Sequence, residues 1–592
     1  MKELWYVSCS PRNPAKIRNE VALFAKLEGE KWNKRDEKGE LIVQKKFAVM
    51  LSQLEGFEGE ASGKESAFSA RDRVAPMKTY GFAYIDKDGI IRITKAGHEL
   101  VKGGDEERIF LMQMLKWQYP SWQHKGPEYE GEDATLFCAR KAGYYFMPFL
   151  LVLQVVKRVD GLTKREIAMF LLPHHRMRGL SKITSQIIKY RNAREKQKGR
   201  VGKKSYDDRT HARIFRKLYR DLLASKKSSS ERKIELDKKV SNSRDVADAC
   251  IRLFRYTGLF ATQKDRMVLN NTKEEEINLI LSRKFKLVNY YDNVDRFYHY
   301  FGDSDRPALP FYEKSFLIKR AISLRKQIEI KKASFPVAVS LDKINVSELK
   351  VLTTRQLLRK IRELTELYRA LSGKQMETYL KTPSGQQDVL DFYESIVHYE
   401  VADPATFFEW NTWRAMIALD ESQEIRPYLK LDDSLQPVDC ARGNTADIVA
   451  EFKNYAVAIE VTLTSGRRQY MTETEPVTFH VGRCQDEENR KGRKRKVYGL
   501  FIAPNISKHT ANYFWQYVSK LEVPDYGNVT VVPIDLVTWK DILLFANSIG
   551  YLRDHALGDL LAAIEKSATD SNKYDTWLSS IPKLIETWKG QL

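Results

Sequence analysis

The sequence predicts a multidomain α+β protein in which two helix-and-hairpin units are followed by a helical domain and then by a mixed α/β domain. The chain has 592 residues, which is too many for one hydrophobic core. A helix, a short hairpin and another helix occur in that order in the first half, and after residue 385 strands alternate with helices. We therefore expect domains at residues 1–150, 151–300, 301–385 and 386–592.

The overall composition favours a folded protein with a polyanionic partner. Hydrophobic residues make up 43% of the chain and aromatic residues 11%, which is ample for packed cores and argues against a disordered chain. Lys and Arg number 99 against 78 Asp and Glu, and the formal net charge of +21 favours nucleic acid as the partner. On charge alone, a basic protein without such a partner is the alternative.

Cysteine usage and hydropathy predict a cytoplasmic protein. The five cysteines are scattered and never spaced as CxxC, so neither a zinc module nor a disulfide framework is indicated. The N-terminus lacks the apolar core of a signal peptide. The longest apolar run, near Tyr145–Val156, is short of the ~20 residues that span a bilayer. We expect no membrane partner.

Two segments of the first half have the pattern of a hairpin followed by a helix. Thr79–Gly97 predicts a strand, a tight turn, a second strand and a helix capped by Thr94. Arg244–Leu281 repeats this order, with its last helix opened by Asn271 or Thr272. Winged helices have this order, and they occur in DNA-reading and in protein-interaction domains. We expect two winged-helix-like units, and the basic balance favours DNA.

Two further segments are predicted to be helical from the period of their apolar residues. Leu162–Leu172 begins with Thr163 and Glu166 in capping-box spacing and would open the second unit. Leu317–Leu380 is predicted to form a packed helical spacer. Its apolar residues recur in steps of four and three, at Leu357, Ile361, Leu364, Tyr368 and Leu371.

The α/β domain is predicted from short apolar runs that alternate with helical segments. We expect helices at Gln387–Glu400 and Thr406–Leu419. The expected strands are Asp447–Phe452, Ala456–Leu463, Val497–Ala503 and Val529–Pro533.

The predicted hairpin Asn444–Ser465 carries the strongest chemical signal. It turns at Lys453–Asn454, so Asp447 and Glu460 would lie near one another at the same end of its two strands. Close carboxylates repel unless a cation neutralises them, and a hard, oxygen-seeking ion such as Mg²⁺ suits them. Such an ion polarises a phosphate and helps to generate hydroxide. A purely structural hairpin is the alternative, because acidic residues at hairpin ends are common.

This arrangement resembles the PD-(D/E)xK nuclease core, in which an Asp and a downstream Glu on adjacent strands hold the metal. Two positions depart from that pattern, because Ala446 stands where the family has Pro and Thr462 where it has Lys. The ammonium group that would orient water is therefore missing. The candidates to replace it are His480, which exchanges protons near neutral pH, and Arg467 or Arg468, which stabilise phosphate charge.

Longer segments carry a more specific resemblance. In the first half they are WYVSCSPRNPAKI, SARDRVAPMKTYGF, LKWQYPSWQHKG, RDVADA and FRYTGLF. In the second half they are FEWNTW, NTADI, IEVT, TEPVTFH and LFIAPNI. Through these segments the chain resembles, nearly from end to end, the AlwI family of type IIS restriction endonucleases and the site-specific nicking endonucleases related to it.

The resemblance implies two DNA-reading subdomains, a helical linker domain and a PD-(D/E)xK-type cleavage domain that cuts at a fixed distance outside a short asymmetric site. It also implies Mg²⁺ as cofactor, 5′-phosphate ends and one strand cut per cleavage domain. Cutting both strands would need a second cleavage domain, from a homodimer or a small partner subunit. The implied active-site positions are Glu409, Asp447, Glu460, Glu473 and His480, with Asp447, Glu460 and Glu409 as metal ligands.

Contacts with double-stranded DNA are expected mainly from two clusters, because Arg, Lys, Asn and Gln read base edges while most basic residues hold phosphates. Arg71, Arg73 and Lys78 come just before the first predicted wing. The aromatic and basic run that follows has packing between subdomains as its alternative. It supplies Lys116, Trp117, Gln118, Gln123, His124 and Lys125.

Two further basic segments are less specific. Arg191–Arg220 either clamps phosphates or is an exposed, solvated loop around its glycines. Arg490–Lys496 precedes a buried strand and would grip the strand being cut.

Together these patterns predict a sequence-specific, Mg²⁺-dependent DNA endonuclease of type IIS character, which either nicks one strand or cuts both with a second cleavage domain. The alternative is a non-catalytic, sequence-specific DNA-binding protein with a degenerate nuclease domain. The missing lysine keeps this alternative open, and the retained carboxylates argue against it.

Overall fold

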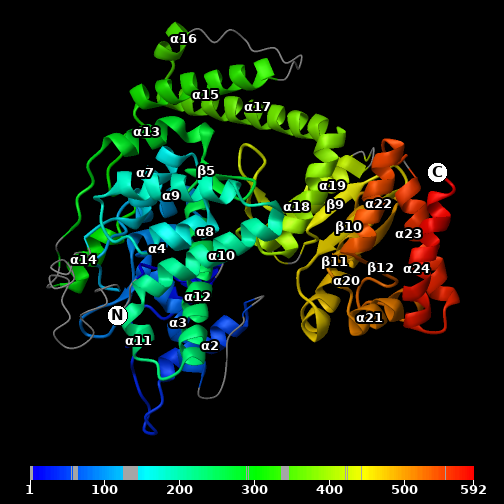
Figure 1. Cartoon of the computed structure of the whole chain (residues 1–592), viewed down its shortest axis with the longest axis horizontal. Helices are drawn as coiled ribbons and strands as arrows, with labels where there is room; N and C mark the ends of the chain where they lie inside the picture. Colours follow the sequence, from blue (N-terminus) through cyan, green and yellow to red (C-terminus); the bar gives the residue numbers. More distant parts are fainter. Residues whose placement is uncertain are drawn as a thin grey trace. The chain divides into compact units, whose positions relative to one another are not determined.

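The structure is a computed structural model that describes residues 4–11, 13–54, 57, 65–123, 145–288, 290, 293–334, 346–419, 422, 424–441, 443, 445–553 and 555–592. These residues form a mixed α/β protein of two compact units (Figure 1). The first unit is Met1–Ile330 with Val339–Thr365, and the second is Lys331–Ala338 with Glu366–Leu592. None of the helices within the described ranges combines the length and the apolar character needed to cross a bilayer.

The first unit begins with helices and a two-stranded hairpin. The hairpin pairs Ala83 with Ile93 and Ile85 with Ile91, and the Thr94 side chain then caps a helix by accepting a hydrogen bond from the N–H of Gly97 (3.1 Å). The predicted order of strand, turn, strand and capped helix is confirmed. The elements are α1 (Ala15–Ala25), α2 (Ile42–Ser52), α3 (Ser66–Thr79), β1 (Ala83–Ile85), β2 (Ile91–Ile93), α4 (Lys95–Val101) and α5 (Glu106–Met114).

A three-stranded sheet of order β3-β5-β4 follows in the same unit. The predicted capping box of Thr163 and Glu166 is confirmed. The helix after the hairpin is capped by Asn270, so the predicted cap at Asn271 or Thr272 is wrong, and these two residues already belong to the first turn. The elements are α7 (Pro148–Val159), β3 (Leu162–Thr163), α8 (Lys164–Glu166), a π-helical turn (Ile167–Leu171), β4 (Phe260–Gln263), β5 (Arg266–Leu269), a 3-10 turn (Asn271–Lys273) and α13 (Glu274–Ser282).

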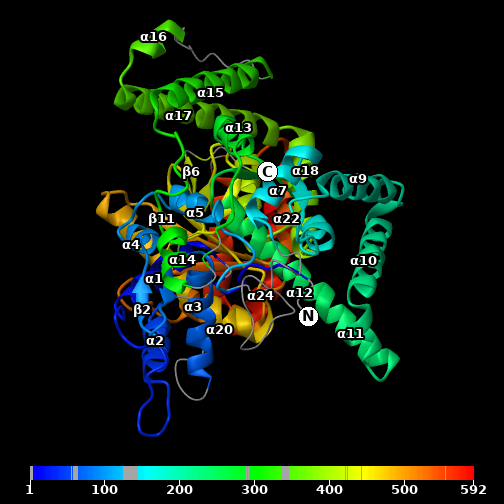
Figure 2. The same cartoon turned by 90° about the vertical axis from the view of Figure 1, so that its left-hand side faces the viewer.

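Long helices lie between β3 and β4 in the sequence, and Figure 2 shows α9, α10 and α11 projecting from the rest of the first unit. The stretch Arg191–Arg220 falls on these helices, so its prediction as a loop is wrong. The glycines of this stretch lie at the start of a helix rather than in a linker. The elements are α9 (Leu180–Glu195), α10 (Gly199–Leu218), α11 (Arg220–Ala224) and α12 (Ser229–Arg255).

The segment predicted as a helical spacer is helical in its described residues. All five residues of its predicted apolar row, from Leu357 to Leu371, are at most 5% exposed, which confirms that this face is packed. The chain crosses between the two units at three places, and all three fall near or within these helices. The elements are α14 (Val294–Phe301), α15 (Lys314–Ser334), α16 (Val346–Val351) and α17 (Thr354–Leu380).

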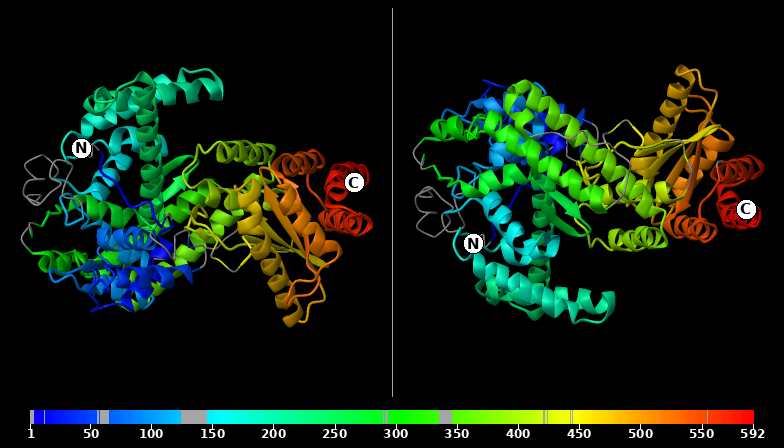
Figure 3. Two further views of the ribbon diagram at one scale, coloured as in Figure 1. Left: turned by 90° about the horizontal axis from the view of Figure 1, so that it is seen from below. Right: turned by 90° about the horizontal axis from the view of Figure 1, so that it is seen from above.

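The second unit is built around a five-stranded mixed sheet of order β12-β11-β10-β9-β6, which Figure 3 shows with its helices. The pairs β10–β11 and β11–β12 are parallel, whereas β9 is antiparallel to both β10 and β6. The four predicted strands are confirmed. The strands are β6 (Glu424–Pro427), β7 (Lys430–Leu431), β8 (Pro437–Asp439), β9 (Ile448–Glu451), β10 (Tyr455–Val461), β11 (Lys496–Ala503) and β12 (Thr530–Asp535).

Helices cover this sheet and set the position of the polar residues described below. The two predicted helices are confirmed as α18 (Pro383–Val397) and α19 (Pro404–Leu419), and α19 packs against β9 and β10. The other helices are α20 (Gly466–Arg490), α21 (Lys508–Ser519), α22 (Leu536–Ile549), α23 (Ala556–Asp570) and α24 (Tyr574–Lys589).

Helix α20 approaches β11 at a glycine. A Cβ added to Gly499 would lie 2.7 Å from Val481 Cγ2 on α20 and 3.0 Å from Val531 Cγ2 on β12. Only a residue without a side chain fits there, so Gly499 allows the helix to lie close against the sheet.

Candidate active site

Strands β9 and β10 bring Asp447 and Glu460 to the same end of their hairpin. The antiparallel register pairs Ile448 with Ile459, so Asp447 and Glu460 come next as opposed residues. Asp447 Oδ2 accepts a hydrogen bond from the N–H of Val461 (2.9 Å). This bond holds the Asp447 carboxylate against the strand that carries Glu460.

Glu409 reaches the same end of the sheet from helix α19. The side chain is buried, and its Oε2 accepts a hydrogen bond from the N–H of Ala441 (2.8 Å). The negative charges of Asp447, Asp403 and Asp439 all act on it. The sequence analysis did not single out Asp403 and Asp439, although Asp439 ends a short apolar strand in the way that Asp447 precedes one.

Helix α20 supplies Glu473 and His480, which lie two turns apart on one side of the helix. His480 Nδ1 and Glu460 Oε1 are hydrogen-bonded at 2.7 Å. Glu473 Oε1 accepts hydrogen bonds from the hydroxyls of Thr462 (3.2 Å) and Thr464 (3.3 Å). The segment after the hairpin therefore passes back beside it in the form of a helix.

Thr462 occupies the position at which the PD-(D/E)xK pattern has a lysine. It is buried, and its hydroxyl positions Glu473 and cannot provide a positive charge. Arg467 and Arg468 lie exposed in the first turn of α20. Of the three candidates to replace the lysine, His480 is the one with a hydrogen bond to Glu460.

Burial and mutual repulsion act together on these acids. Burial raises the pKa of Asp447 well above its usual value, and the charge of Glu460 raises it further. Burial, followed by the charge of Glu473, raises the pKa of Glu460, and burial, followed by the charge of Asp447, raises the pKa of Glu409. Carboxylates that a protein buries without enough positive charge from its own side chains create a demand for a cation.

The chemistry of the donors fits a hard divalent ion, although the protein does not preform a cage. Within the described residues, no group of three or more His, Cys, Asp or Glu side chains is arranged as a metal cluster. The three predicted ligands Asp447, Glu460 and Glu409 therefore do not form one compact triad. Mg²⁺ commonly uses one or two carboxylates and completes its shell with water and substrate phosphate, so a partial set of oxygen ligands suits it.

The predicted DNA-contacting residues before the first hairpin differ in exposure. Arg71 is exposed and donates a hydrogen bond to Gln44 Oε1 (3.0 Å). Arg73 is 9% exposed and forms an ion pair with the buried Glu20 (2.8 Å), so its guanidinium is part of the core of the first unit. Burial lowers the pKa of Lys78.

The aromatic and basic run after α5 is largely internal. Trp117 is fully buried and packs edge-on against Trp5, with 6.0 Å between the ring centroids, so the packing alternative describes it. Lys116 is also buried and donates hydrogen bonds to Gln113 Oε1 and to the carbonyl of Asp303. Burial lowers the pKa of Lys116 to about 7. Neither side chain presents a group to a DNA groove.

The rest of that run is divided between the interior and the surface. Gln118 is buried and exchanges two hydrogen bonds with the backbone of Val288, at 2.9 and 3.0 Å. Gln123 keeps partial exposure. His124 and Lys125 lie outside the described residues.

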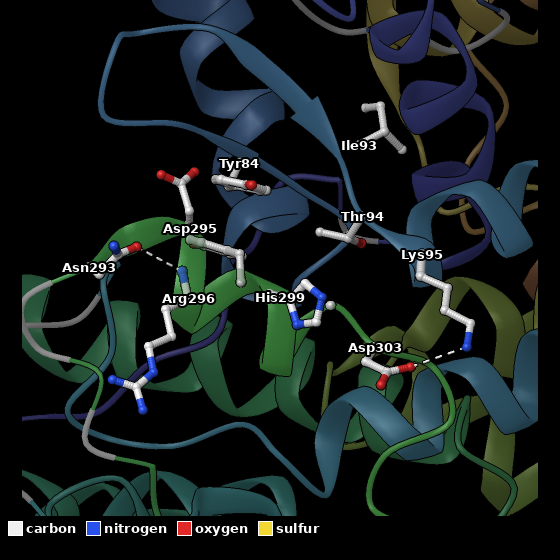
Figure 4. A pocket seen from close by; sticks show the side chains of 11 residues that line it. Tyr84, Ile93, Thr94, Lys95, Asn293, Asp295, Arg296, His299 and Asp303 are labelled. Carbon is white, nitrogen blue, oxygen red and sulfur yellow. Dashed lines mark hydrogen bonds and ion pairs between the residues drawn. The ribbon is translucent and has the colours of Figure 1, made fainter.

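A pocket of about 670 Å³ lies beside the β1–β2 hairpin of the first unit (Figure 4). Tyr84 from β1 stacks on Tyr298 from α14, with 4.6 Å between the ring centroids. Lys95 forms an ion pair with Asp303 (3.3 Å) at one side, and Figure 4 shows His299 between these two groups of residues. The first hairpin thus borders a hollow that combines aromatic surface with charges of both signs.

The basic run before β11 lies at the opposite end of the hairpin from Asp447. Glu451 forms ion pairs with Arg493 and Arg495, both at 2.6 Å, and with Arg426. Arg495 is 9% exposed and also pairs with Glu488. The run therefore lies about 13 Å along β9 from Asp447, at about 3.3 Å per residue, and its contact with the strand being cut stays a prediction.

Buried carboxylates at the strand ends of a mixed sheet, in a strongly basic chain, suit a DNA endonuclease. The model of the AlwI restriction endonuclease family matches residues 78–542. The chain therefore belongs to the AlwI restriction endonuclease family. No curated protein matches it.

Two solved structures resemble parts of the chain. The small subunit (R.BspD6I2) of the heterodimeric restriction endonuclease R.BspD6I is 25% identical, covers 35% of this chain and 99% of its own, and has a TM-score of 0.28. The BpuJ1 endonuclease binding domain, solved with pyrene- and phenanthrene-modified DNA, is 14% identical, covers 48% of this chain and 92% of its own, and has a TM-score of 0.31. At these TM-scores neither likeness bears on the arrangement of this chain.

Proposed function

We propose that this protein is a sequence-specific DNA endonuclease of type IIS character, which recognises a short asymmetric site and hydrolyses a phosphodiester at a fixed distance outside it. The observation that carries the proposal is the burial of Asp447, Glu460 and Glu409 at one end of the sheet, where burial and the charges of neighbouring acids raise their pKa values. Membership of the AlwI restriction endonuclease family supports it.

The proposed cofactor is Mg²⁺, with Asp447, Glu460 and Glu409 as the residues that would hold it. When bound, such an ion polarises the phosphate and lowers the pKa of a water molecule. The carboxylate oxygens suit this ion better than a softer metal, for which thiolate or imidazole ligands would be expected.

The remaining active-site residues are assigned by their hydrogen bonds. The hydrogen bond between His480 Nδ1 and Glu460 Oε1 orients the imidazole. We assign proton exchange to this imidazole, in place of the lysine that the motif lacks here. The hydroxyls of Thr462 and Thr464 fix the carboxylate of Glu473. In the hydrolysis, the water oxygen forms a bond to phosphorus, the bond to the 3′-oxygen breaks, and a 5′-phosphate end remains.

DNA recognition is assigned to the first half of the chain. In this proposal residues 1–150 and 151–300 form two winged-helix-like reading subdomains, 301–385 form a helical linker domain, and 386–592 form the PD-(D/E)xK-type cleavage domain. Among the residues that the structure describes, Arg71, Lys78 and Gln123 keep some exposure and remain candidates for DNA contact. The buried residues Arg73, Lys116, Trp117 and Gln118 would act by holding the unit in shape.

The cytoplasm is the proposed location. One cleavage domain cuts one strand in this scheme. Double-strand cutting would then require a second domain, either from another copy of the chain or from a small partner subunit. A protein acting alone would be a nickase.

The experiment that tests the proposal is incubation of supercoiled plasmid with purified protein and Mg²⁺, followed by run-off sequencing of both product strands. We expect breaks at a constant offset from one short sequence, and no breaks in EDTA. Open circles broken in one strand would identify a nickase, and linear product would identify a double-strand cutter. Breaks at random positions would contradict sequence-specific cleavage.

The second candidate is a non-catalytic DNA-binding protein, and Thr462 in place of the motif lysine is the observation that favours it. Such a protein would retard DNA in a gel and leave plasmid intact with Mg²⁺. The plasmid experiment separates the two candidates directly.

A further inference from the structure

Helix α10 is strongly basic and is anchored along one face. Seven of its 20 residues are Lys or Arg and two are acidic. Asp207, His211 and Phe215 recur every four residues, are buried, and turn that face toward the rest of the unit. The helix packs there against α9 and α12. Its position is therefore fixed by a core of its own.

The opposite face carries a row of cations, which we call the α10 ridge. Arg209, Arg213, Arg216 and Lys217 are all exposed, and their spacing of four, three and one residues places them on one side of the helix. Within the described part of the chain, none of the four has an acidic side chain within ion-pair distance. Four positive charges thus lie side by side without local neutralisation.

The acids of α10 are engaged elsewhere, which explains this imbalance. Asp207 pairs with Arg194 of α9 (3.0 Å). Asp208 accepts hydrogen bonds from Arg165 (3.1 Å) and Arg244 (2.6 Å). Both acids therefore neutralise arginines of neighbouring elements, and the ridge keeps its full charge.

We propose that the α10 ridge binds the phosphate backbone of double-stranded DNA. From Arg209 to Lys217 the helix has nine residues, which span about 12 Å at 1.5 Å per residue. This length matches three to four nucleotides of one strand at about 3.4 Å each. Arginine, which supplies three of the four cations, binds phosphate oxygens through two parallel N–H groups. Phosphates are the same at every base pair, so the ridge holds DNA in place without reading its sequence.

This inference rests on the proposed function only in taking DNA as the ligand. It adds a binding surface that lies far from the carboxylates in sequence and takes no part in hydrolysis. A failure of the ridge and a failure of catalysis are therefore measured separately, because DNA binding is measured in EDTA and cleavage in Mg²⁺.

The test is the full-length variant Arg209→Gln, Arg213→Gln, Arg216→Gln and Lys217→Gln. Glutamine is a good helix former, so α10 is expected to persist, which circular dichroism and thermal unfolding verify. Affinity for a DNA duplex is measured in EDTA over a series of salt concentrations. The slope of log affinity against log salt is negative, and we expect its magnitude to decrease by about three, at roughly 0.9 per lost phosphate contact. At about 0.1 M salt, affinity should fall on the order of 10- to 100-fold.

A matched control removes the same amount of charge from exposed positions that do have acidic partners, Glu363 and Glu377. The control variant is Arg359→Gln, Lys360→Gln, Lys374→Gln and Lys381→Gln. We expect its salt slope to stay within about one of wild type, because these cations are already neutralised.

Three outcomes would overturn the proposal. An equal loss in the control variant would mean that total charge matters and the ridge does not. An unchanged slope in the ridge variant would exclude phosphate contacts there. A loss confined to duplexes that contain the cleavage sequence would assign the ridge to base reading instead.

Discussion

The two ends of the β9–β10 hairpin bury acids in opposite ways. At the turn, Glu451 is 5% exposed, and although its burial acts to raise its pKa, the hydrogen bond from Arg495 and the charge of Arg426 lower that pKa below its usual value. At the open end, Glu460 is 8% exposed, and burial with the charge of Glu473 raises its pKa. The two side chains are similarly low in exposure, but arginines surround Glu451, whereas Glu460 lies deeper and faces another acid.

This difference separates a structural charge from a chemically active one. Buried charges that are matched by opposite charges hold elements together, as Arg495 does between Glu451 and Glu488. Buried charges that face like charges add nothing to stability and require a ligand that the chain does not supply. The same criterion explains why Arg73, paired with Glu20, is a core residue in spite of its position among predicted DNA contacts.

The largest expected effect comes from removing one charge at the open end. Asp447→Asn keeps the size of the side chain and an oxygen that can accept the hydrogen bond from Val461. We expect the rate of plasmid cleavage in Mg²⁺ to fall at least about 1,000-fold, while DNA affinity in EDTA stays within about twofold. Cleavage at near the wild-type rate would show that the open end is not the catalytic site.

The next effect is expected at the turn end, on stability instead of cleavage. Arg495→Met removes the more buried of the two arginines that pair with both Glu451 and Glu488, and we expect a loss of about 1.5–3 kcal/mol in the free energy of unfolding of the second unit. Urea denaturation measures it. Cleavage per folded molecule should be retained. Loss of cleavage in a folded variant would show that the turn end of the hairpin also belongs to the active site.

The pH dependence of stability in the metal-free protein should follow from the open end. The folded-state pKa values of Asp447 and Glu460 are raised. Their contribution to the free energy of unfolding is therefore complete below about pH 4, and it is lost as the pH rises through the folded-state pKa values. Added Mg²⁺ should therefore raise the melting temperature more at pH 8 than at pH 6, by about 2–4 °C for each kcal/mol regained.

A variant provides the control for this measurement. In EDTA at pH 8, Asp447→Asn should melt at a higher temperature than wild type, because one repelling charge is gone. A lower melting temperature would mean that the carboxylate stabilises the metal-free fold, contrary to the comparison above.

The smallest effect is expected from Arg426→Gln. The Arg426 side chain is 38% exposed and is one of three guanidinium groups around Glu451. We expect a loss of less than about 1 kcal/mol in urea denaturation and no change in cleavage. A loss as large as that of Arg495→Met would show that Glu451 depends on each arginine equally.

Local patterns predicted the part of the site that depends on local structure. The hairpin follows from apolar runs on both sides of a turn, and this fixes Asp447 opposite Glu460. The largely apolar run that became α19 placed Glu409 on a helix. Each of these inferences needs only a few consecutive residues.

Features that depend on distant partners could not be predicted in this way. Helix α20 contains Pro476 and is polar along most of its length, so its period is weak even though it carries Glu473 and His480. The alternation of aromatic and basic residues around Trp117 is typical of a DNA-binding surface as well as of a core. Which of the two is formed depends on Trp5, more than a hundred residues away in the sequence.

Gly499 shows how far the spacing at the open end depends on a residue with no functional group. His480 is adjacent to Val481, whose side chain rests where a Cβ of Gly499 would be. A methyl group there would lie 2.7 Å from Val481 Cγ2, closer than packed carbon atoms come, so α20 and the sheet would have to move apart. Gly499→Ala would therefore change the separation of His480 and Glu460 without altering any polar residue.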